Sequence, residues 1–75
     1  MKELIEYICK SLVDDPSAVR VDERVTSGRV IIQLRVASRD MGRVIGKEGR
    51  VANAMRALLR VSSARRGKPC VLEID

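Results

Sequence analysis

Two segments in which apolar and polar residues alternate, separated by Ser27-Gly28, restrict the fold more than any other feature of this sequence. The alternating apolar positions are Val19, Val21 and Val25 in the first segment and Val30, Ile32, Leu34 and Val36 in the second. A period of two is typical of a β-strand with one buried face, and a Ser-Gly pair fits a tight hairpin turn. Because a two-residue loop sets Val21 opposite Leu34, the hairpin gathers the apolar residues on one face. Glu23 is the exception on that face, and we expect a local twist or partial exposure there.

Helical periodicity marks most of the remaining chain. The first helix carries apolar residues at spacings of three and four and is ended by Asp-Asp-Pro at residues 14–16, because the residue before a proline avoids helical geometry. Asp40 is expected to cap the second helix, and residues 46–49 separate it from the third. The predicted elements are helices over residues 2–13, 40–45 and 50–64 and strands over residues 19–26, 30–36 and 70–75.

The expected fold class is α+β, with the order α-β-β-α-α-β in a single domain of residues 1–75. The hairpin makes the first two strands antiparallel, and the crossover through two helices lets the third strand run parallel to the second, which gives a three-stranded mixed sheet. The helices are expected to pack on one face of this sheet. The other face would expose Arg20, Arg24, Ile31, Arg35, Val71 and Glu73.

The long third helix has an apolar arc of nearly half its circumference. Its expected core line is Val51, Met55, Leu58 and Ser62, with Ala54, Leu59 and Val61 on the flanks and Asn53, Arg56 and Arg60 opposite. Such an arc is wider than one small sheet needs. We therefore weigh two interpretations: a homodimer through helix 50–64, in contact at Leu59 and Val61, or a first helix that covers both flanks.

Missing residue types exclude several functions. The chain has no His, Phe or Trp, and Tyr7 is its one aromatic residue. Without histidine, the common nucleophile pairs and most zinc sites cannot form, and no second carboxylate pairs with Asp40 or Glu48. We therefore expect no enzyme, no catalytic residues, no metal and no cofactor.

The two cysteines, Cys9 and Cys70, lie on apolar faces and are expected to be small core residues in a reducing, cytoplasmic compartment. No apolar run is long enough to insert into a membrane.

Positive charge is concentrated in one part of the chain. The formal net charge is +5, and residues 39–68 contain nine Lys and Arg against two acids, Asp40 and Glu48. Polarised charge in so small a domain favours a polyanionic partner, whereas the alternative is a solvated face that only keeps the chain soluble.

The segment Gly46-Lys47-Glu48-Gly49 lies between two predicted helices. Two glycines permit a tight reversal, and their missing side chains would let a phosphodiester approach the loop amides and the start of the next helix. Lys47 and Arg50 would add mobile cations, and Val44 and Ile45 would present apolar surface to bases. A Gly-x-x-Gly pattern alone is also an ordinary turn between helices, so its place in this element order and its basic surroundings carry the prediction.

With this loop in this order, the sequence resembles a KH domain of the type II arrangement and, more narrowly, the small bacterial KhpA proteins. The resemblance covers essentially the whole chain and is strongest over residues 40–50 and 54–60. It implies binding of single-stranded RNA through the loop and an adjacent apolar groove that holds about four nucleotides. It also implies a cytoplasmic RNA chaperone or post-transcriptional regulator, and association with a larger KH-domain protein of the KhpB (Jag) type. Ala52, where many KH domains have a bulky aliphatic residue, and the acidic Glu48 imply weaker or less selective binding.

Two classes of function therefore stand side by side. In the first, the chain is an RNA-binding module, and the sugar of the nucleic acid is left open because contacts from amides to phosphates do not distinguish RNA from DNA. In the second, the chain is a protein–protein module, a homodimer or a partner of a KhpB-type protein, in which the glycine loop is only structural. The predicted RNA-binding residues are Arg43, Val44, Ile45, Gly46, Lys47, Glu48, Gly49, Arg50 and Arg56.

Overall fold

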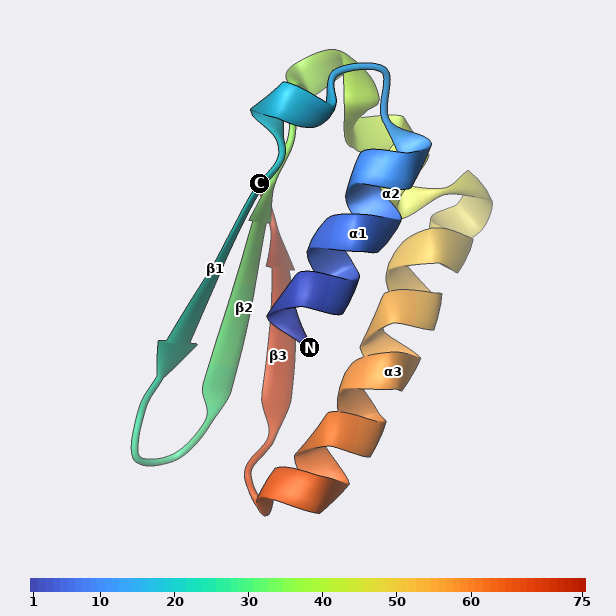
Figure 1. Ribbon diagram of the computed structural model, residues 1–75. Helices are drawn as coiled ribbons and strands as arrows, with labels where there is room; N and C mark the ends of the chain where they lie inside the picture. Colours follow the sequence, from blue (N-terminus) through green and yellow to red (C-terminus); the bar gives the residue numbers. More distant parts are fainter.

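The computed structural model describes residues 1–75 and has the expected α+β architecture (Figure 1). The main elements in chain order are α1 (Lys2–Leu12), β1 (Arg20–Val25), β2 (Val30–Arg35), α2 (Met41–Ile45), α3 (Arg50–Arg66) and β3 (Cys70–Ile74). Single turns of 3₁₀-helix cover Pro16–Ala18, Ser38–Asp40 and Lys47–Gly49. The predicted order α-β-β-α-α-β is confirmed, and each predicted helix and strand ends within two residues of its observed boundary.

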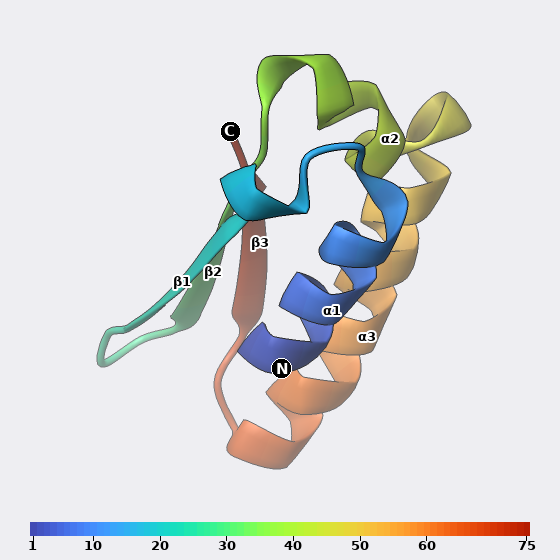
Figure 2. The same cartoon turned by 45° about the horizontal axis from the view of Figure 1, so that its top comes forward.

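The sheet has the order β1-β2-β3, with β1 antiparallel and β3 parallel to the central β2. The predicted hairpin register is confirmed, because Val21 pairs with Leu34 and Val25 with Val30. Figures 1 and 2 show that the helices cover one face of the sheet while the tip of the β1–β2 hairpin extends beyond them. The open face exposes Arg20, Arg24 and Arg35, as expected.

Aliphatic residues from every main element form the core, which includes Ile5 and Cys9 of α1, Ile32 and Leu34 of β2, and Leu72 of β3. The core line that was predicted for α3 is confirmed at Met55 and in part at Val51, which is partly buried against the core, but it is wrong at Leu58. The buried residues of this helix are Ala52, Met55 and Leu59, whereas Leu58 is 39% exposed. The helix α3 is therefore rotated about its own axis by roughly 50° from the expected orientation, which is half of the angle between consecutive residues. Residues 51–62 of α3 are apolar over so wide an arc that their periodicity does not decide which line faces the sheet.

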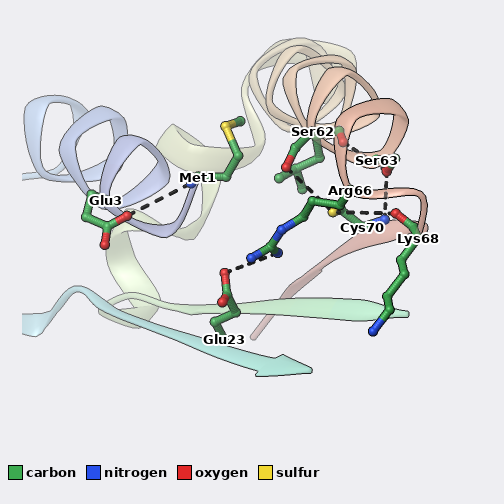
Figure 3. Close-up of polar contacts among 9 residues, drawn as sticks. Met1, Glu3, Glu23, Ser62, Ser63, Arg66, Lys68 and Cys70 are labelled. Atoms are coloured by element: carbon green, nitrogen blue, oxygen red, sulfur yellow. Dashed lines mark hydrogen bonds and ion pairs between the residues drawn. The ribbon is translucent and has the colours of Figure 1, made fainter. Parts of the chain in front are cut away.

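Glu23 breaks the apolar pattern because it pairs with a residue outside the sheet. It lies opposite Ile32 in the register, and its carboxylate Oε2 is 3.7 Å from Nη1 of Arg66 at the end of α3 (Figure 3). The expected partial exposure is confirmed, since the side chain is 27% exposed. The ion pair links the β1–β2 hairpin to the C-terminal turn of α3.

Both cysteines are free and pack against the core. Cys9 is fully buried, with its Sγ 3.9 Å from Sδ of Met55, and burial raises the pKa of its thiol to about 11. The thiol therefore stays protonated at neutral pH and is a poor nucleophile. Cys70 is half-buried, and its backbone amide donates a 2.7 Å hydrogen bond to the Ser63 hydroxyl, which ties the start of β3 to α3 (Figure 3).

None of the helices is both long enough and apolar enough to cross a lipid bilayer.

Candidate functional site

The two glycines of the loop between α2 and α3 adopt backbone conformations that favour glycine. Gly46 has φ 79° and ψ 169°, and Gly49 has φ 78° and ψ 14°. A Cβ atom on Gly46 would lie 2.6 Å from Cγ2 and 2.8 Å from the backbone nitrogen of Val51 in the first turn of α3. Gly46 is therefore required both by its dihedral angles and by the close approach of the next helix, so the main chain at this bend carries no side chain.

Glu48, between the glycines, lies in the left-handed region with φ 57° and ψ 24°. It is the only residue other than glycine with positive φ in the structure, a conformation that costs about 1–2 kcal/mol for an L-residue. The surrounding loop holds Glu48 in this conformation, and the residue is exposed. A non-glycine residue kept in this region is a recognised feature of functional loops.

The loop amides divide into two pairs. The amide of Gly49 donates to the carbonyl of Gly46 at 3.1 Å, and the amide of Arg50 donates to the carbonyl of Lys47. The expectation that the loop amides and the start of α3 are open to a phosphodiester is therefore wrong for the amides of Gly49 and Arg50, because these two amides close the 3₁₀ turn. The amides of Lys47 and Glu48 donate to no carbonyl among the turn and loop hydrogen bonds.

The cations around the loop also fall into two groups. Lys47, Arg50 and Arg56 are exposed and take part in no ion pair. Arg43, in contrast, is occupied within the fold: its Nη2 is 3.2 Å from Oδ2 of Asp14 and its Nε is 3.7 Å from Oδ1 of Asp40. The expectation that Arg43 is available to a ligand is therefore not supported by its contacts.

The apolar surface beside the loop is smaller than expected. Val44 is fully buried in the core and Ala52 is 3% exposed, so neither side chain is open to a ligand, and the expectation that Val44 presents apolar surface is wrong. Ile45 is 37% exposed and is the apolar surface that remains. Neither of the two hollows described below is lined by a residue of the loop.

Asp40 has a role that sequence reasoning missed. It occupies the predicted N-cap position of α2, but it is completely buried and its side chain makes no hydrogen bond to the first amides of that helix. Its carboxylate instead accepts hydrogen bonds from the backbone amides of Asp14 at 3.1 Å and Asp15 at 3.2 Å. Asp40 thereby fastens the turn after α1 to the start of α2, the helix that leads into the glycine loop. An Asp directly before a predicted helix is an ordinary cap pattern, so nothing in the sequence indicated this role.

The two flanks of α3 differ in character. One flank faces α1, and the groove between them, about 320 Å³ in volume, is lined by Met1, Leu4, Leu58, Val61, Ser62 and Arg65. Leu4, Leu58 and Val61 are 41%, 39% and 57% exposed, so α1 does not cover this flank. At 100° per residue, Arg56 and Arg60 lie on the opposite flank. Leu59 is 1% exposed, so its expected place in a dimer contact is wrong.

No group of three or more His, Cys, Asp or Glu side chains is placed to hold a metal ion. A helix–Gly-x-x-Gly–helix unit joined to a three-stranded mixed sheet in this order defines a KH domain of the type II arrangement. The family model described as KhpA/KhpB, KH domain, matches residues 2–74, and the chain therefore belongs to the KhpA/KhpB family of KH domains. This family is not known for enzymatic activity.

Proteins similar to this chain carry the name RNA-binding protein KhpA. The protein from Clostridium perfringens is 46% identical over 74 residues, which cover 99% of each chain. The protein from Aquifex aeolicus is 43% identical over 74 residues, 99% of this chain and 94% of its own. The protein from Treponema pallidum is 53% identical over 62 residues, 83% of this chain and 78% of its own.

Proposed function

We propose that this chain binds single-stranded RNA by its sugar-phosphate backbone at the Gly46–Gly49 loop. The observation that carries the proposal is the bare bend at Gly46, pressed against Val51, beside the amides of Lys47 and Glu48. In this arrangement the two amides donate to a phosphate oxygen, and the exposed cations of Lys47 and Arg50 neutralise the phosphate charge. The name of the relatives, RNA-binding protein KhpA, supports RNA as the ligand.

The surface next to the loop suggests that binding is weak and tolerant of sequence. Arg56 can reach a further phosphate along α3, whereas Ile45 offers only a small apolar contact to a base. Aromatic stacking, worth about 1–3 kcal/mol per base, is not available in this part of the chain. With Lys47, Arg50 and Arg56 as the phosphate contacts, log affinity should fall against log salt with a slope of about −2.

Changing both Lys47 and Glu48 to Asp takes the formal charge of the loop from zero to −2 and leaves both glycines in place. We expect RNA affinity to fall by about tenfold or more, because each charge-assisted contact contributes about 1.5–3 kcal/mol. Fluorescence anisotropy with a labelled single-stranded RNA measures the loss, and a DNA of the same sequence tests selectivity for the sugar. The matched control is Lys10→Asp on α1, which changes the net charge equally and should leave affinity nearly unchanged. Equal affinities for the two variants would show that the loop is not the binding site.

At the level of the cell, we propose a cytoplasmic RNA chaperone or post-transcriptional regulator. Sequence-tolerant contacts to the backbone suit a protein that acts on many RNAs, since they engage a strand without reading its bases. Residues 1–75 would act in this role as one KH domain.

A second candidate function is association through the α1–α3 groove. We propose a second copy of the chain as the occupant, because Leu4, Leu58 and Val61 form an exposed apolar strip that two copies can bury against each other around a two-fold axis. Pairing would also place two weak RNA sites in one particle and raise avidity. A KhpB-type protein is the alternative occupant, since one family model describes both kinds of KH domain.

Val61→Glu should abolish this association while leaving the monomer folded, because Val61 is 57% exposed. Ala57→Glu adds the same charge about one turn away, at an exposed position that does not line the groove, and should dimerise as the original chain does. Sedimentation equilibrium over a range of concentrations distinguishes monomer from dimer. An original chain that remains monomeric at the highest concentration rules out the homodimer and leaves the KhpB-type partner as the occupant to test.

A further inference from the structure

The excess positive charge of the molecule does not lie at the glycine loop. Five cations are found around the loop, and four carboxylates in the same region offset most of their charge. The cations are Arg39, Arg43, Lys47, Arg50 and Arg56, and the carboxylates are Asp14, Asp15, Asp40 and Glu48. Asp14 and Asp15 join this region through the hydrogen bonds from their amides to Asp40 and the ion pair of Asp14 with Arg43. The loop therefore offers a bare main chain and free amides to a phosphate, but its net charge attracts a polyanion only weakly.

A second group of cations lies at the opposite end of α3, beside the β1–β2 hairpin. We call Arg29, Arg66 and Lys68 the distal cluster; Glu23 is the acid paired with it. Arg66 and Lys68 line a hollow of about 240 Å³ together with Val25 and Val30. Contacts place both cations there: Arg66 is 3.7 Å from Glu23 (Figure 3), and Nζ of Lys68 is 3.4 Å from the carbonyl oxygen of Thr26.

The hollow combines features that suit a nucleotide. Val25 is 57% exposed and provides apolar surface beside the two cations of the hollow, Arg66 and Lys68. A cation pair next to an exposed aliphatic side chain can hold a phosphate and contact the attached sugar or base. Because Glu23 is the only carboxylate in contact with the cluster, the local charge remains positive when the pair with Arg66 is formed.

A line of cations without acids connects the two ends. Between Glu48 and Glu73 the chain contains no Asp or Glu, and α3 exposes Arg50, Arg56 and Arg60 along its length. The 17 residues of α3 span about 25 Å at 1.5 Å per residue. A continuous polyanion that follows the helix meets cations over this whole distance, whereas a small anion or a short acidic peptide would use only one end.

We propose that the distal cluster is a second site for the RNA backbone, occupied by nucleotides of the strand that lie beyond those held at the glycine loop. The inference rests on the proposed function, since the loop is what anchors the strand. It implies that one copy of the chain engages a longer stretch than the roughly four nucleotides of the loop site. Glu23 acts as an internal competitor, because a phosphate that binds Arg66 must displace its carboxylate.

The experiment compares two RNAs, one of about four nucleotides and one of about twelve, by fluorescence anisotropy. In Arg66→Glu/Lys68→Glu, we expect affinity for the longer RNA to fall about tenfold and affinity for the shorter RNA to change less than about twofold. The control Arg20→Glu/Arg24→Glu makes the same charge change on the open sheet face. The inference is overturned if the two double variants lose equal affinity for the longer RNA. An acidic protein partner at the distal cluster would then be the explanation to pursue.

Glu23→Gln tests the site in the opposite direction without reversing a cation. Releasing Arg66 should raise affinity for the longer RNA about two- to threefold and leave the shorter RNA unaffected, while Glu6→Gln, which removes the same charge from α1, should change neither. No gain beyond that of Glu6→Gln would contradict the inference. The Lys47/Glu48 loop variant separates the two proposals: if it still binds the shorter RNA, the loop assignment itself fails, whatever the distal variants show.

Discussion

Gly46→Ala should cost about 3 kcal/mol or more of the free energy of unfolding. The backbone of Gly46, at φ 79° and ψ 169°, lies in a region that is essentially restricted to glycine, and the added methyl would lie 2.6 Å from Cγ2 of Val51. A domain of 75 residues is stable by about 4–11 kcal/mol, so this one methyl group would remove a large part of its stability. Urea unfolding followed by far-ultraviolet circular dichroism measures the loss, since the chain has no Trp for fluorescence.

Gly49→Ala is the matched control. Its φ of 78° is also left-handed, but the nearest atom to an added Cβ is Nδ2 of Asn53 at 3.6 Å, an ordinary contact. We expect a cost of about 1–2 kcal/mol from the backbone alone. Combining Gly46→Ala with Val51→Ala should recover only part of the loss, because the backbone nitrogen of Val51 still lies 2.8 Å from the new methyl. Equal costs for the two glycines would mean that α3 does not press against the loop in solution.

The sequence was sufficient to predict the hairpin and the order of elements because these depend on local patterns. Strict alternation on both sides of Ser27-Gly28 determines the pairing of Val21 with Leu34, since a slip of one residue would expose every buried side chain. The helix boundaries follow from equally local signals, the proline after α1 and the glycine after α3. Gly67, at φ 71°, is the left-handed residue that ends α3.

The rotation of α3 could not be predicted in the same way. Ala52, Leu58 and Leu59 are all apolar, so periodicity alone does not say which of them faces the sheet. The choice depends on where α1 lies, and α1 leaves the flank with Leu58 and Val61 open. Leu59, which the sequence assigned to a dimer contact, is consequently part of the core. Val61, the other residue of that proposed contact, is exposed in the structure.

The position of the excess positive charge in the fold could not be predicted from the sequence for a related reason. Counting charges along residues 39–68 omits Asp14 and Asp15, which the fold brings to Asp40 and Arg43 from a distant part of the chain. The loop identified by its glycines is therefore nearly neutral in its surroundings, and the charge that predicted a polyanionic partner extends along α3 to its far end. The loop whose backbone suits a phosphate and the surface with the excess positive charge therefore lie in different parts of the fold, although the sequence analysis assigned both to one site.

Asp40→Ala should lower the free energy of unfolding by about 2–4 kcal/mol, a second large effect that arises from one carboxylate. The side chain is completely buried and accepts hydrogen bonds from two backbone amides, those of Asp14 and Asp15. Removing it leaves both donors without a partner and opens a cavity, and each unsatisfied donor costs about 1–3 kcal/mol. Asp40→Asn should fall between the original chain and the alanine variant, because the amide oxygen replaces only one of the two acceptors.

Arg43→Ala separates the hydrogen bonds of Asp40 from its charge. The Arg43 side chain is 54% exposed, so loss of its ion pairs with Asp14 and Asp40 should cost less than about 1 kcal/mol. If Arg43→Ala proves as damaging in urea unfolding as Asp40→Ala, then charge neutralisation, and not the hydrogen bonds to the backbone, is what Asp40 requires. If it is mild, the junction between α1 and α2 depends on two amides and one buried carboxylate. RNA affinity measured on the folded Asp40→Ala variant would then report how far this junction positions the loop that follows α2.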